Sequence, residues 1–544
     1  MPSENIGFVH FDKSTNKNNR IEALVVKEKV SSLLLNKFVK IINAVGDNKN
    51  FIGRIAEGPF FQPEEVSRDS ALAQISILHG DEFPAPPNFY ASFIIELLGE
   101  LDGERIKNSG ARPSPQSKVV TMSDEELNSI LALTEGDMMI GHLEGYENIF
   151  VKFNSKKISI IPRNIGIFGT VGSGKTNTAQ VLIEELASAD PKWAIIVLDI
   201  EGEYTMMNKA NNIQHEIDRL KHFGKTAEGL EDFHVLKLCN SESTVSTAEE
   251  VTIRIDQIDP YVLSEILNTT EPQTAALLGI IDELKGKSKD SKKGKEKTLK
   301  EELLEEDYDM LSPGKKTKSG YTLEDIISVI DQYKTDPGKL GVGKGSLQPL
   351  RRKLYSLKRT GAFDDPTAIS INPDKLLKAG QVTIFDLSYT GDDEKNLLIA
   401  QLLRRIFDAK KKNKDYPRTA IMIEEAHTFI SRENREKMFE TMRMLKEIAR
   451  RGRKRWLALC FISQQPSHLP NEIFELSNTR IVHNIRSSKN LEVLKISSGD
   501  VTEEMWDGVP NLDVGQAIIN GPQFRNSLVA KIRFPKTMRL KQEG

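Results

Sequence analysis

A glycine-rich octapeptide constrains this chain more than any other feature of its sequence. Residues Gly169–Thr176 read GTVGSGKT and match the pattern G-x-x-x-x-G-K-[ST] at every fixed position. The preceding run, Asn164–Phe168, predicts a short buried strand, and Asn177–Leu186 predicts an amphipathic helix. In that arrangement backbone N–H groups and the positive end of the helix surround phosphate groups. The octapeptide, called the phosphate loop below, therefore predicts a nucleoside triphosphate site in an α/β fold.

The expected ligands of the phosphate loop are ATP and Mg²⁺. Lys175 is expected to reach the β- and γ-phosphates, and the Thr176 hydroxyl is expected to hold the metal ion. The full set expected to contact the nucleotide is Gly169, Thr170, Val171, Gly172, Ser173, Gly174, Lys175, Thr176 and Asn177.

Length and composition are those of a globular protein of several domains. The 544 residues suggest about three or four domains, and 38% hydrophobic with 28% charged residues is usual for soluble chains. No run of eighteen apolar residues and no signal-peptide pattern is present, so we expect a cytoplasmic protein without a membrane partner. Two cysteines, Cys239 and Cys460, do not make a disulfide framework. The net charge of −3 does not exclude nucleic acid, because basic residues can gather in one channel.

Strand and helix patterns divide the chain into four segments. Residues 1–155 predict a small β-barrel or sandwich that serves as a scaffold or docking domain. Residues 156–258 and 363–544 alternate buried strands with helices, which predicts one ATPase core with a parallel sheet. Residues 259–362 predict a helical insertion, with a solvated lysine-rich loop at 285–300. The expected strands of the first segment are Ile6–Phe11, Glu22–Val26, Val39–Ala44, Ala73–Leu78 and Asn148–Phe153, and its expected helix is Ser123–Leu133.

Two adjacent carboxylates follow a strand pattern in the last segment. Residues 419–423 are mostly apolar and are followed by Glu424 and Glu425. The carboxyl edge of a parallel sheet is where ligands bind in such folds. We therefore expect Glu425 to activate the attacking water and Glu424 to hold Mg²⁺, through a water molecule. The alternative is a solvated strand end, which the upstream phosphate loop makes the weaker interpretation.

Three further polar positions are weaker candidates on residue chemistry alone. Arg450 and Arg451 precede Gly452 and are either a solvated helix end or an arginine finger for a neighbouring subunit's γ-phosphate. Gln464 ends a strand pattern and is either a sensor of the γ-phosphate or simply a polar strand end. These alternatives stay open at this stage. Asp199 and Asp386 also follow apolar runs and could equally be turn residues, and His427 follows the acid pair and could equally be a helix-cap histidine.

Taken in order, these segments resemble the HerA family of hexameric DNA-translocating ATPases, within the HerA–FtsK group. The motifs that carry the resemblance are Ile140–Leu143 (IGHL), the phosphate loop, Leu198–Tyr204 (LDIEGEY), Ile423–His427 (IEEAH), Arg450–Lys454 (RRGRK), Ser463–Ser467 (SQQPS) and Gly515–Gly521 (GQAIING). The resemblance implies a RecA-like core with an N-terminal barrel similar to the HAS barrel and a helical-bundle insertion. Residue by residue, it implies Lys175 and Thr176 at nucleotide and Mg²⁺, Glu425 as base, Arg450 as the finger in trans and Gln464 as sensor.

This chain departs from the family's pattern at two positions. Glu424 stands where Asp is more familiar, and Arg451 stands where the family often has Glu. The second departure leaves the finger undecided between Arg450 and Arg451.

The function that the resemblance implies is a homohexameric motor that moves double-stranded DNA. It also implies a nuclease or effector partner on the barrel, either a NurA-type nuclease in DNA end processing or an effector such as a sirtuin-like NAD hydrolase in antiphage defence. The alternative function is an ATPase scaffold that activates an effector with little translocation. A small-molecule kinase is a weaker option, because such an enzyme needs no water-activating glutamate.

Overall fold

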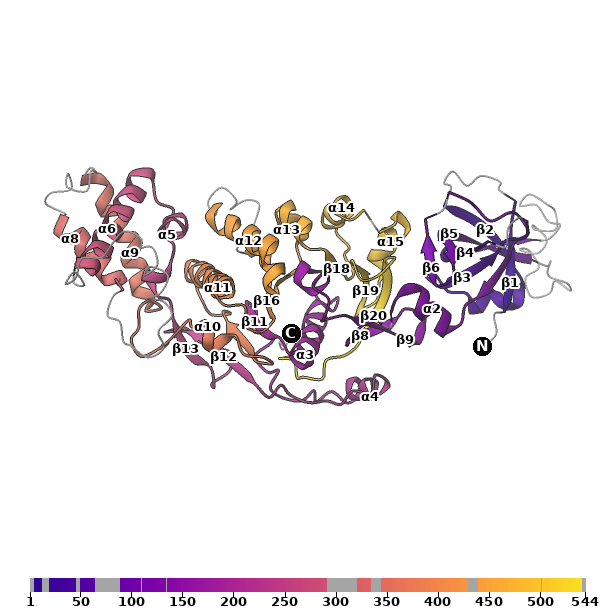
Figure 1. The fold of residues 1–544 in the computed structure, drawn as a ribbon, viewed down its shortest axis with the longest axis horizontal. Coiled ribbons are helices and arrows are strands. Elements are labelled where there is room, and N and C mark those ends of the chain that lie inside the picture. Colours follow the sequence, from indigo (N-terminus) through magenta and orange to yellow (C-terminus); the bar gives the residue numbers. More distant parts are fainter. Residues whose placement is uncertain are drawn as a thin grey trace, which may run out of the picture.

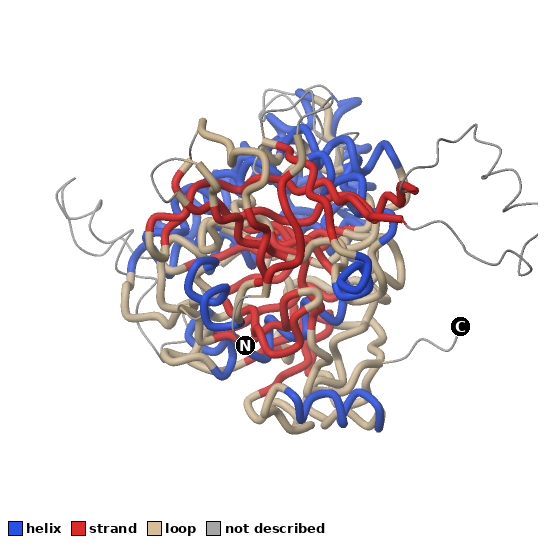
Figure 2. The backbone as a smooth tube through the Cα atoms, turned by 90° about the vertical axis from the view of Figure 1, so that its right-hand side faces the viewer, coloured by secondary structure: helices blue, strands red, loops and turns tan. Residues whose placement is uncertain are grey.

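The protein has three parts arranged along one long axis (Figure 1). The computed structural model describes residues 4–11, 19–45, 49–63, 89–108, 110–133, 135–290, 320–333, 344–428, 439–499 and 501–540. A helical lobe lies at one end, a sheet-based core lies in the middle, and a β-barrel lies at the other end. Figure 2 views the molecule from the barrel end. None of the described helices is both long and apolar enough to cross a lipid bilayer.

The N-terminal part is a closed antiparallel barrel. Its strands are β1 (Asn5–Val9), β2 (Arg20–Val25), β3 (Phe38–Ile42), β4 (Asn50–Pro63), β5 (Phe89–Asp102) and β7 (Lys118–Thr121), and β6 (Arg105–Lys107) extends β5. The order is β2-β1-β7-β3-β4-β5, and pairing of β2 with β5 closes the ring, which removes free strand edges. In β2 every second residue is buried, as expected for a strand with one face on the core. The predicted strand at 73–78 lies outside the described residues.

The large sheet begins earlier in the chain than the sequence indicates. After α2 (Asp124–Leu131), which Ser123 caps by accepting the Glu126 N–H at 3.2 Å, come β8 (Met138–Leu143) and β9 (Tyr146–Phe153). We assign residues 1–155 to the barrel from sequence, but β8 pairs with β20 of the large sheet, so β8 and β9 belong to the core. Alternating hydrophobicity predicts a strand but does not say which sheet the strand joins.

The core is a mixed sheet of thirteen described strands covered by helices. The order is β14-β13-β12-β15-β11-β16-β17-β10-β18-β19-β20-β8-β9, parallel from β14 to β18 and antiparallel beyond. The strands not yet given are β10 (Ile165–Phe168), β11 (Ala194–Asp199), β12 (Phe233–Leu238), β13 (Glu249–Thr252), β14 (Ile369–Ser370), β15 (Val382–Asp386), β16 (Thr419–Ile423), β17 (Leu457–Ser463), β18 (Thr479–Val482), β19 (Gln516–Asn520) and β20 (Leu528–Ile532). Every residue of β10, β11, β15, β16 and β17 is buried, because helices cover both faces of the parallel half.

The covering helices lie in the connections between strands of the large sheet. They are α3 (Lys175–Ser188), α4 (Gln214–His222), α10 (Pro373–Leu376), α11 (Asp392–Lys412), α12 (Phe439–Arg451), α13 (Asn471–Leu476), α14 (Ser488–Ser497) and α15 (Glu503–Gly508). Strands that alternate with helices confirm the predicted α/β core with a P-loop.

The helical lobe interrupts the core between β13 and β14. It contains α5 (Pro260–Ile266), α6 (Glu271–Asp290), α8 (Leu323–Tyr333) and α9 (Lys344–Thr360), whose buried leucines and isoleucines continue the hydrophobic core of the sheet. The sequence predicts a lysine-rich loop over 285–300. Its first six residues instead extend α6 to Asp290, and 291–300 lie outside the described residues.

Helix α15 joins the core to the barrel. Arg54 of β4 is 4% exposed and donates hydrogen bonds to Glu96 Oε2 at 2.5 Å and to Thr502 Oγ1 at 3.2 Å. Arg20 of β2 pairs with Glu504 of α15. Arg54 and Glu96 both belong to the barrel, so the contacts that join the barrel to the core around α15 are the Arg54–Thr502 hydrogen bond and the Arg20–Glu504 ion pair.

Candidate nucleotide site

The phosphate loop lies at the carboxyl edge of the parallel sheet. Strand β10 runs between β17 and β18, so the loop is flanked by the ends of both neighbours. Gly172 and Gly174 have φ angles of +74° and +114°, a region that glycine adopts without strain. A Cβ at Gly169 would lie 2.5 Å from Ser173 Oγ, so that glycine is required by space. The loop therefore has the compact form that phosphate binding needs.

Two side chains from the start of α3 make contacts beside the phosphate loop. Lys175 is 8% exposed and its Nζ donates to the Thr170 carbonyl at 3.0 Å, across the loop. Burial lowers the pKa of Lys175, while the nearby Glu425 carboxylate opposes that shift. Thr176 Oγ1 donates to Glu203 Oε2 at 2.6 Å. A phosphate group bound beside Lys175 would pair with the buried ammonium charge of this lysine.

Glu425 is held between the ends of β16 and β17. It is 5% exposed, and its Oε2 lies 3.1 Å from His427 Nδ1 and accepts the Gln464 N–H at 3.4 Å. His427 Nδ1 is also 3.2 Å from Ser463 Oγ. The φ of Glu425 is +41°, a strained conformation for a residue with a side chain. Its contacts fix the carboxylate at the sheet edge, where the sequence predicts the general base.

The Glu424 carboxyl group is paired with Asp199 at the end of β16, and its predicted water-mediated contact with Mg²⁺ stays a prediction. Glu424 is 3% exposed, shares a hydrogen bond with Asp199, and accepts the Ile200 N–H at 3.2 Å through Oε2. Burial raises the pKa of Glu424 well above its usual value and that of Asp199 to about 7. The carboxyl group that contacts Thr176 belongs instead to Glu203, in the loop after β11. We missed Glu203 as a site residue, although it lies in the LDIEGEY motif and follows a strand that ends at the same edge.

Thr176 and Glu203 are the residues that fit a magnesium ion. Among the residues that the structure describes, no group of three His, Cys, Asp or Glu side chains could hold a metal ion alone. Mg²⁺ in phosphate sites is usually bound by one or two protein oxygens together with phosphates and water. The hydroxyl of Thr176 and the carboxylate of Glu203, 2.6 Å apart, supply such a pair.

Arg450 and Arg451 lie at the opposite edge of the sheet. They end α12, just before β17 begins, and the Asn164 side chain ahead of β10 donates to the Ala449 carbonyl at 3.4 Å. Strand β17 separates this edge from Gln464 by roughly 20 Å. Arg450 is exposed, and Arg451 pairs with Glu447 of its own helix at 2.6 Å. Neither arginine reaches the phosphate loop of its own chain.

A cavity of about 570 Å³ opens beside the phosphate loop. It is lined by Thr170, Val171, Gly172, Ser173, Gln464, Asn484, Arg486, Leu512, Asp513 and Val514. Gln464 therefore lines the cavity beside the phosphate loop, and its contact with the γ-phosphate stays a prediction. The five residues after position 480 have no motif in the sequence that marks them, because they come from loops after β18 and before β19.

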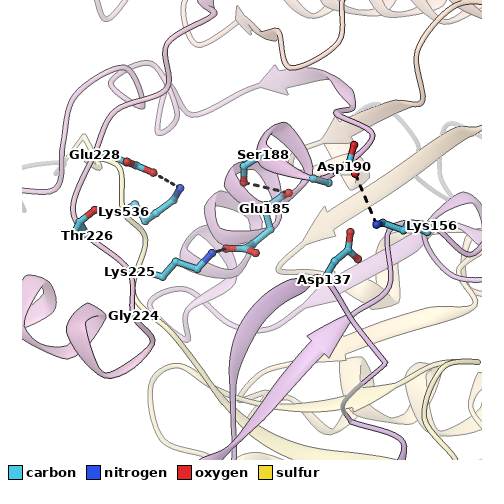
Figure 3. Close-up of a pocket in the computed structure, with 11 residues that line it drawn as sticks. Asp137, Lys156, Glu185, Ser188, Asp190, Gly224, Lys225, Thr226, Glu228 and Lys536 are labelled. Carbon is cyan, nitrogen blue, oxygen red and sulfur yellow. Dashed lines mark hydrogen bonds and ion pairs between the residues drawn. The ribbon is translucent and has the colours of Figure 1, made fainter.

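A second cavity, of about 460 Å³, lies at the far end of α3 (Figure 3). Its lysines are paired with its acids: Lys225 with Glu185 at 2.8 Å, Lys536 with Glu228 at 2.7 Å, and Lys156 with Asp190 at 4.0 Å. Since these charges compensate one another, the cavity has no excess positive charge for a polyanion. The candidate nucleotide site is the cavity beside the phosphate loop.

Comparison with known proteins places these features in a family. The family model described as "Helicase HerA, central domain" matches residues 138–406. The DNA double-strand break repair helicase HerA of Sulfolobus acidocaldarius is 24% identical over 85% of this chain and 81% of its own length. A probable helicase of Methanocaldococcus jannaschii is 23% identical over 83% of this chain and 78% of its own. Among solved structures, VirB4 of Thermoanaerobacter pseudethanolicus matches with a TM-score of 0.50 and 14% identity, over 73% of this chain and 96% of that one.

Proposed function

This chain belongs to the HerA family, and on that premise we propose that it is an ATP-driven motor that moves double-stranded DNA through a ring of six copies. The chain is a P-loop enzyme that hydrolyses ATP. The relatives named as DNA double-strand break repair helicases support a role in processing DNA ends.

Hydrolysis is assigned to four side chains at the carboxyl edge of the sheet. Lys175 binds the β- and γ-phosphates, and Thr176 with Glu203 holds the magnesium ion, which neutralises phosphate charge. Glu425 takes a proton from the attacking water. His427, 3.1 Å from the Glu425 carboxylate, keeps that carboxylate oriented. The backbone N–H of Gln464 bonds to the same carboxylate, so a γ-phosphate contact of the Gln464 side chain would be linked to the base.

The position of Arg450 is the observation that best supports an assembly of several copies in a ring. An arginine finger stabilises the charge that develops on the γ-phosphate, and Arg450, at the end of α12, lies at the edge of the sheet opposite the phosphate loop of its own chain. Arg450 is exposed at the opposite edge of the sheet, as a residue that serves a neighbour must be. A head-to-tail contact that repeats this pairing closes into a ring.

The barrel is the proposed docking site for an effector protein. It carries nine of the fifteen exposed large apolar side chains among the described residues, including Phe8, Phe60 and Phe61. This concentration of exposed apolar side chains in one domain supports a protein partner there. A NurA-like nuclease or another effector bound there would meet DNA at the barrel end of the ring.

The test is the dependence of ATP hydrolysis on DNA. A motor that grips phosphates should be stimulated strongly by linear double-stranded DNA, and the stimulation should fall steeply as salt rises from 50 to 200 mM, a range over which phosphate contacts weaken by orders of magnitude. Hydrolysis that ignores DNA would instead support the alternative, a scaffold whose ATPase only switches an effector. Native mass spectrometry with ATP should detect six copies, and a monomer under all conditions would contradict the ring.

A further inference from the structure

The segment 512–515 is fixed against the phosphate loop. The Gly515 N–H donates to the Ser173 carbonyl at 3.0 Å, and a Cβ on Gly174 would come within 3.1 Å of Gly515 Cα. The Thr170 N–H donates to the Asn484 carbonyl at 2.9 Å. The Asn484 side chain in turn donates to the carbonyls of Pro510 and Leu512, each at 2.8 Å. The wall of the cavity is therefore built as one unit with the loop that binds phosphates.

The direction of the bound nucleotide follows from the positions of Glu425 and Gln464. Both lie on the β16 and β17 side of β10, so the γ-phosphate and the attacking water belong on that side. Strand β18 flanks β10 on its other side. A triphosphate that crosses the phosphate loop from the γ end therefore directs its ribose and base toward β18 and β19.

The nucleoside end of the cavity has the chemistry of a ribonucleoside site. It is lined by Arg486, Leu512, Asp513 and Val514. Val514 is 70% exposed although it is apolar, and a purine ring lying on it would remove that surface from water. The exposed carboxylate of Asp513 makes no hydrogen bond with the part of the chain that the structure describes, and a carboxylate is the usual acceptor for ribose hydroxyl groups.

We infer that Asp513 binds the ribose of the nucleotide and sets the preference of this site for ribonucleotides over deoxyribonucleotides. The inference rests on the proposed ATPase function and adds the residue that recognises the sugar. Arg486, on the same wall, offsets the negative charge that Asp513 brings near the phosphates. Asp513 is a binding residue here, so its loss should change affinity for nucleotide more than the rate of the chemical step.

The experiment compares ATP, 2′-deoxy-ATP and 3′-deoxy-ATP in the full-length protein. For each nucleotide, KM and kcat of hydrolysis and the equilibrium Kd are measured in the wild type and in Asp513→Ala. The wild type should prefer ATP over at least one deoxy analogue by roughly tenfold in KM and Kd, as expected for a hydrogen bond to a charged group. Asp513→Ala should raise KM for ATP by a similar factor, leave kcat within about twofold, and abolish the preference.

Two further variants make the result specific. Asp513→Asn keeps an acceptor oxygen and should restore part of the preference. The control is Asp507→Ala, which removes an exposed carboxylate of α15 that lies 3.2 Å from Lys495. This variant should leave KM and Kd for all three nucleotides unchanged. The N–H of Asp513 donates to Gln516 Oε1 at 2.8 Å, a backbone contact that the alanine variant keeps, so the turn should be retained.

The outcomes separate this inference from the proposed function. An Asp513→Ala protein with wild-type KM, Kd and nucleotide preference would overturn the role of Asp513 while leaving the ATPase assignment intact. Loss of kcat without any change in Kd would also overturn it, because the carboxylate would then act elsewhere. A wild-type protein that binds ATP but does not hydrolyse it would contradict the ATPase, yet the Kd comparison would still decide the role of Asp513.

Discussion

The carboxyl groups of Asp199 and Glu424 share a hydrogen bond where β11 and β16 end side by side. Both groups are buried, so the pair retains a proton near neutral pH, where the pKa of Asp199 is raised to about 7. Asp199 also accepts the N–H groups of Gly202 and Tyr204 at 2.7 and 2.9 Å. The pair thus fixes the loop that carries Glu203 to Thr176.

This shared proton predicts a pH-dependent gain in stability for Glu424→Gln. Because the folded-state pKa values are raised, the stability that the protonated pair contributes is present at low pH and is lost as the pH rises through about 7. The amide keeps a donor for Asp199 and does not titrate. The melting temperature of the variant relative to the wild type should therefore rise by roughly 2–4 °C between pH 5 and pH 8. Differential scanning calorimetry at each pH measures the melting temperature of the variant relative to the wild type. The control is Glu201→Gln, at an exposed residue nearby, for which this difference should be the same at pH 5 and pH 8.

The contact between Glu203 and Thr176 predicts that loss of the Glu203 carboxylate raises the magnesium requirement of ATP hydrolysis. Glu203→Gln should raise the Mg²⁺ concentration needed for half-maximal ATP hydrolysis by about tenfold or more, because the carboxylate beside Thr176 is lost as a metal ligand or ligand partner. The measurement is a Mg²⁺ titration of hydrolysis at saturating ATP. Glu201→Gln, two residues away and exposed, is the matched control. Equal Mg²⁺ requirements in both variants would remove Glu203 from the metal site.

Strand β16 and the two glutamates that follow it show which features can be predicted from the sequence alone. Apolar residues followed by two glutamates predict a buried strand that ends at the ligand edge, and β16 confirms this. The pattern cannot say which way each carboxylate points, because that depends on the strand beside β16. Asp199 ends β11, the neighbour of β16, and takes Glu424 as its partner, which leaves Glu203 free to contact Thr176.

The cavity wall illustrates what a motif search cannot find. Arg486, Leu512 and Asp513 are separated from the phosphate loop by more than three hundred residues, and no fixed spacing links them to it. They meet the loop only because β18 inserts beside β10. The same limit explains the assignment of β8 and β9 to the barrel, since their partner β20 lies near the end of the chain.

Loss of the base predicts a protein that binds ATP and scarcely hydrolyses it. Glu425→Gln should lower kcat by about 10²–10⁴-fold, the usual contribution of a general base, because the amide cannot accept the proton of the attacking water. The Kd for ATP should stay within a few-fold of the wild-type value. Hydrolysis under single-turnover conditions and ATP binding by calorimetry test the two parts. A variant with wild-type turnover would exclude Glu425 as the base.

Arg54 is paired with Glu96 inside the barrel and donates a hydrogen bond to Thr502 of the core, so its loss should weaken both the barrel and its contact with the core. Arg54→Ala leaves Glu96 buried without its cation and also removes the hydrogen bond to Thr502 of the core, a loss on the order of 3–5 kcal/mol. The expected result is a lower melting temperature and faster proteolysis between barrel and core. Lys107→Ala breaks the exposed pair with Asp102, whose attraction is screened by water, and should leave the melting temperature close to the wild-type value. Equal effects of both substitutions would contradict a buried interface.

Arg450 predicts complementation between two inactive proteins. Lys175→Ala copies lack a working phosphate loop but keep Arg450, whereas Arg450→Ala copies keep the loop and lack the finger. In a head-to-tail ring that mixes both at random, on the order of one interface in four unites an intact loop with an intact arginine. Mixing the two should therefore restore measurable DNA-stimulated hydrolysis, after conditions that let subunits exchange. Arg451→Ala is the matched control: Arg451 pairs with Glu447 on its own helix, so this variant alone should stay active. If mixing restores nothing although native mass spectrometry detects mixed rings, Arg450 does not complete the neighbouring site.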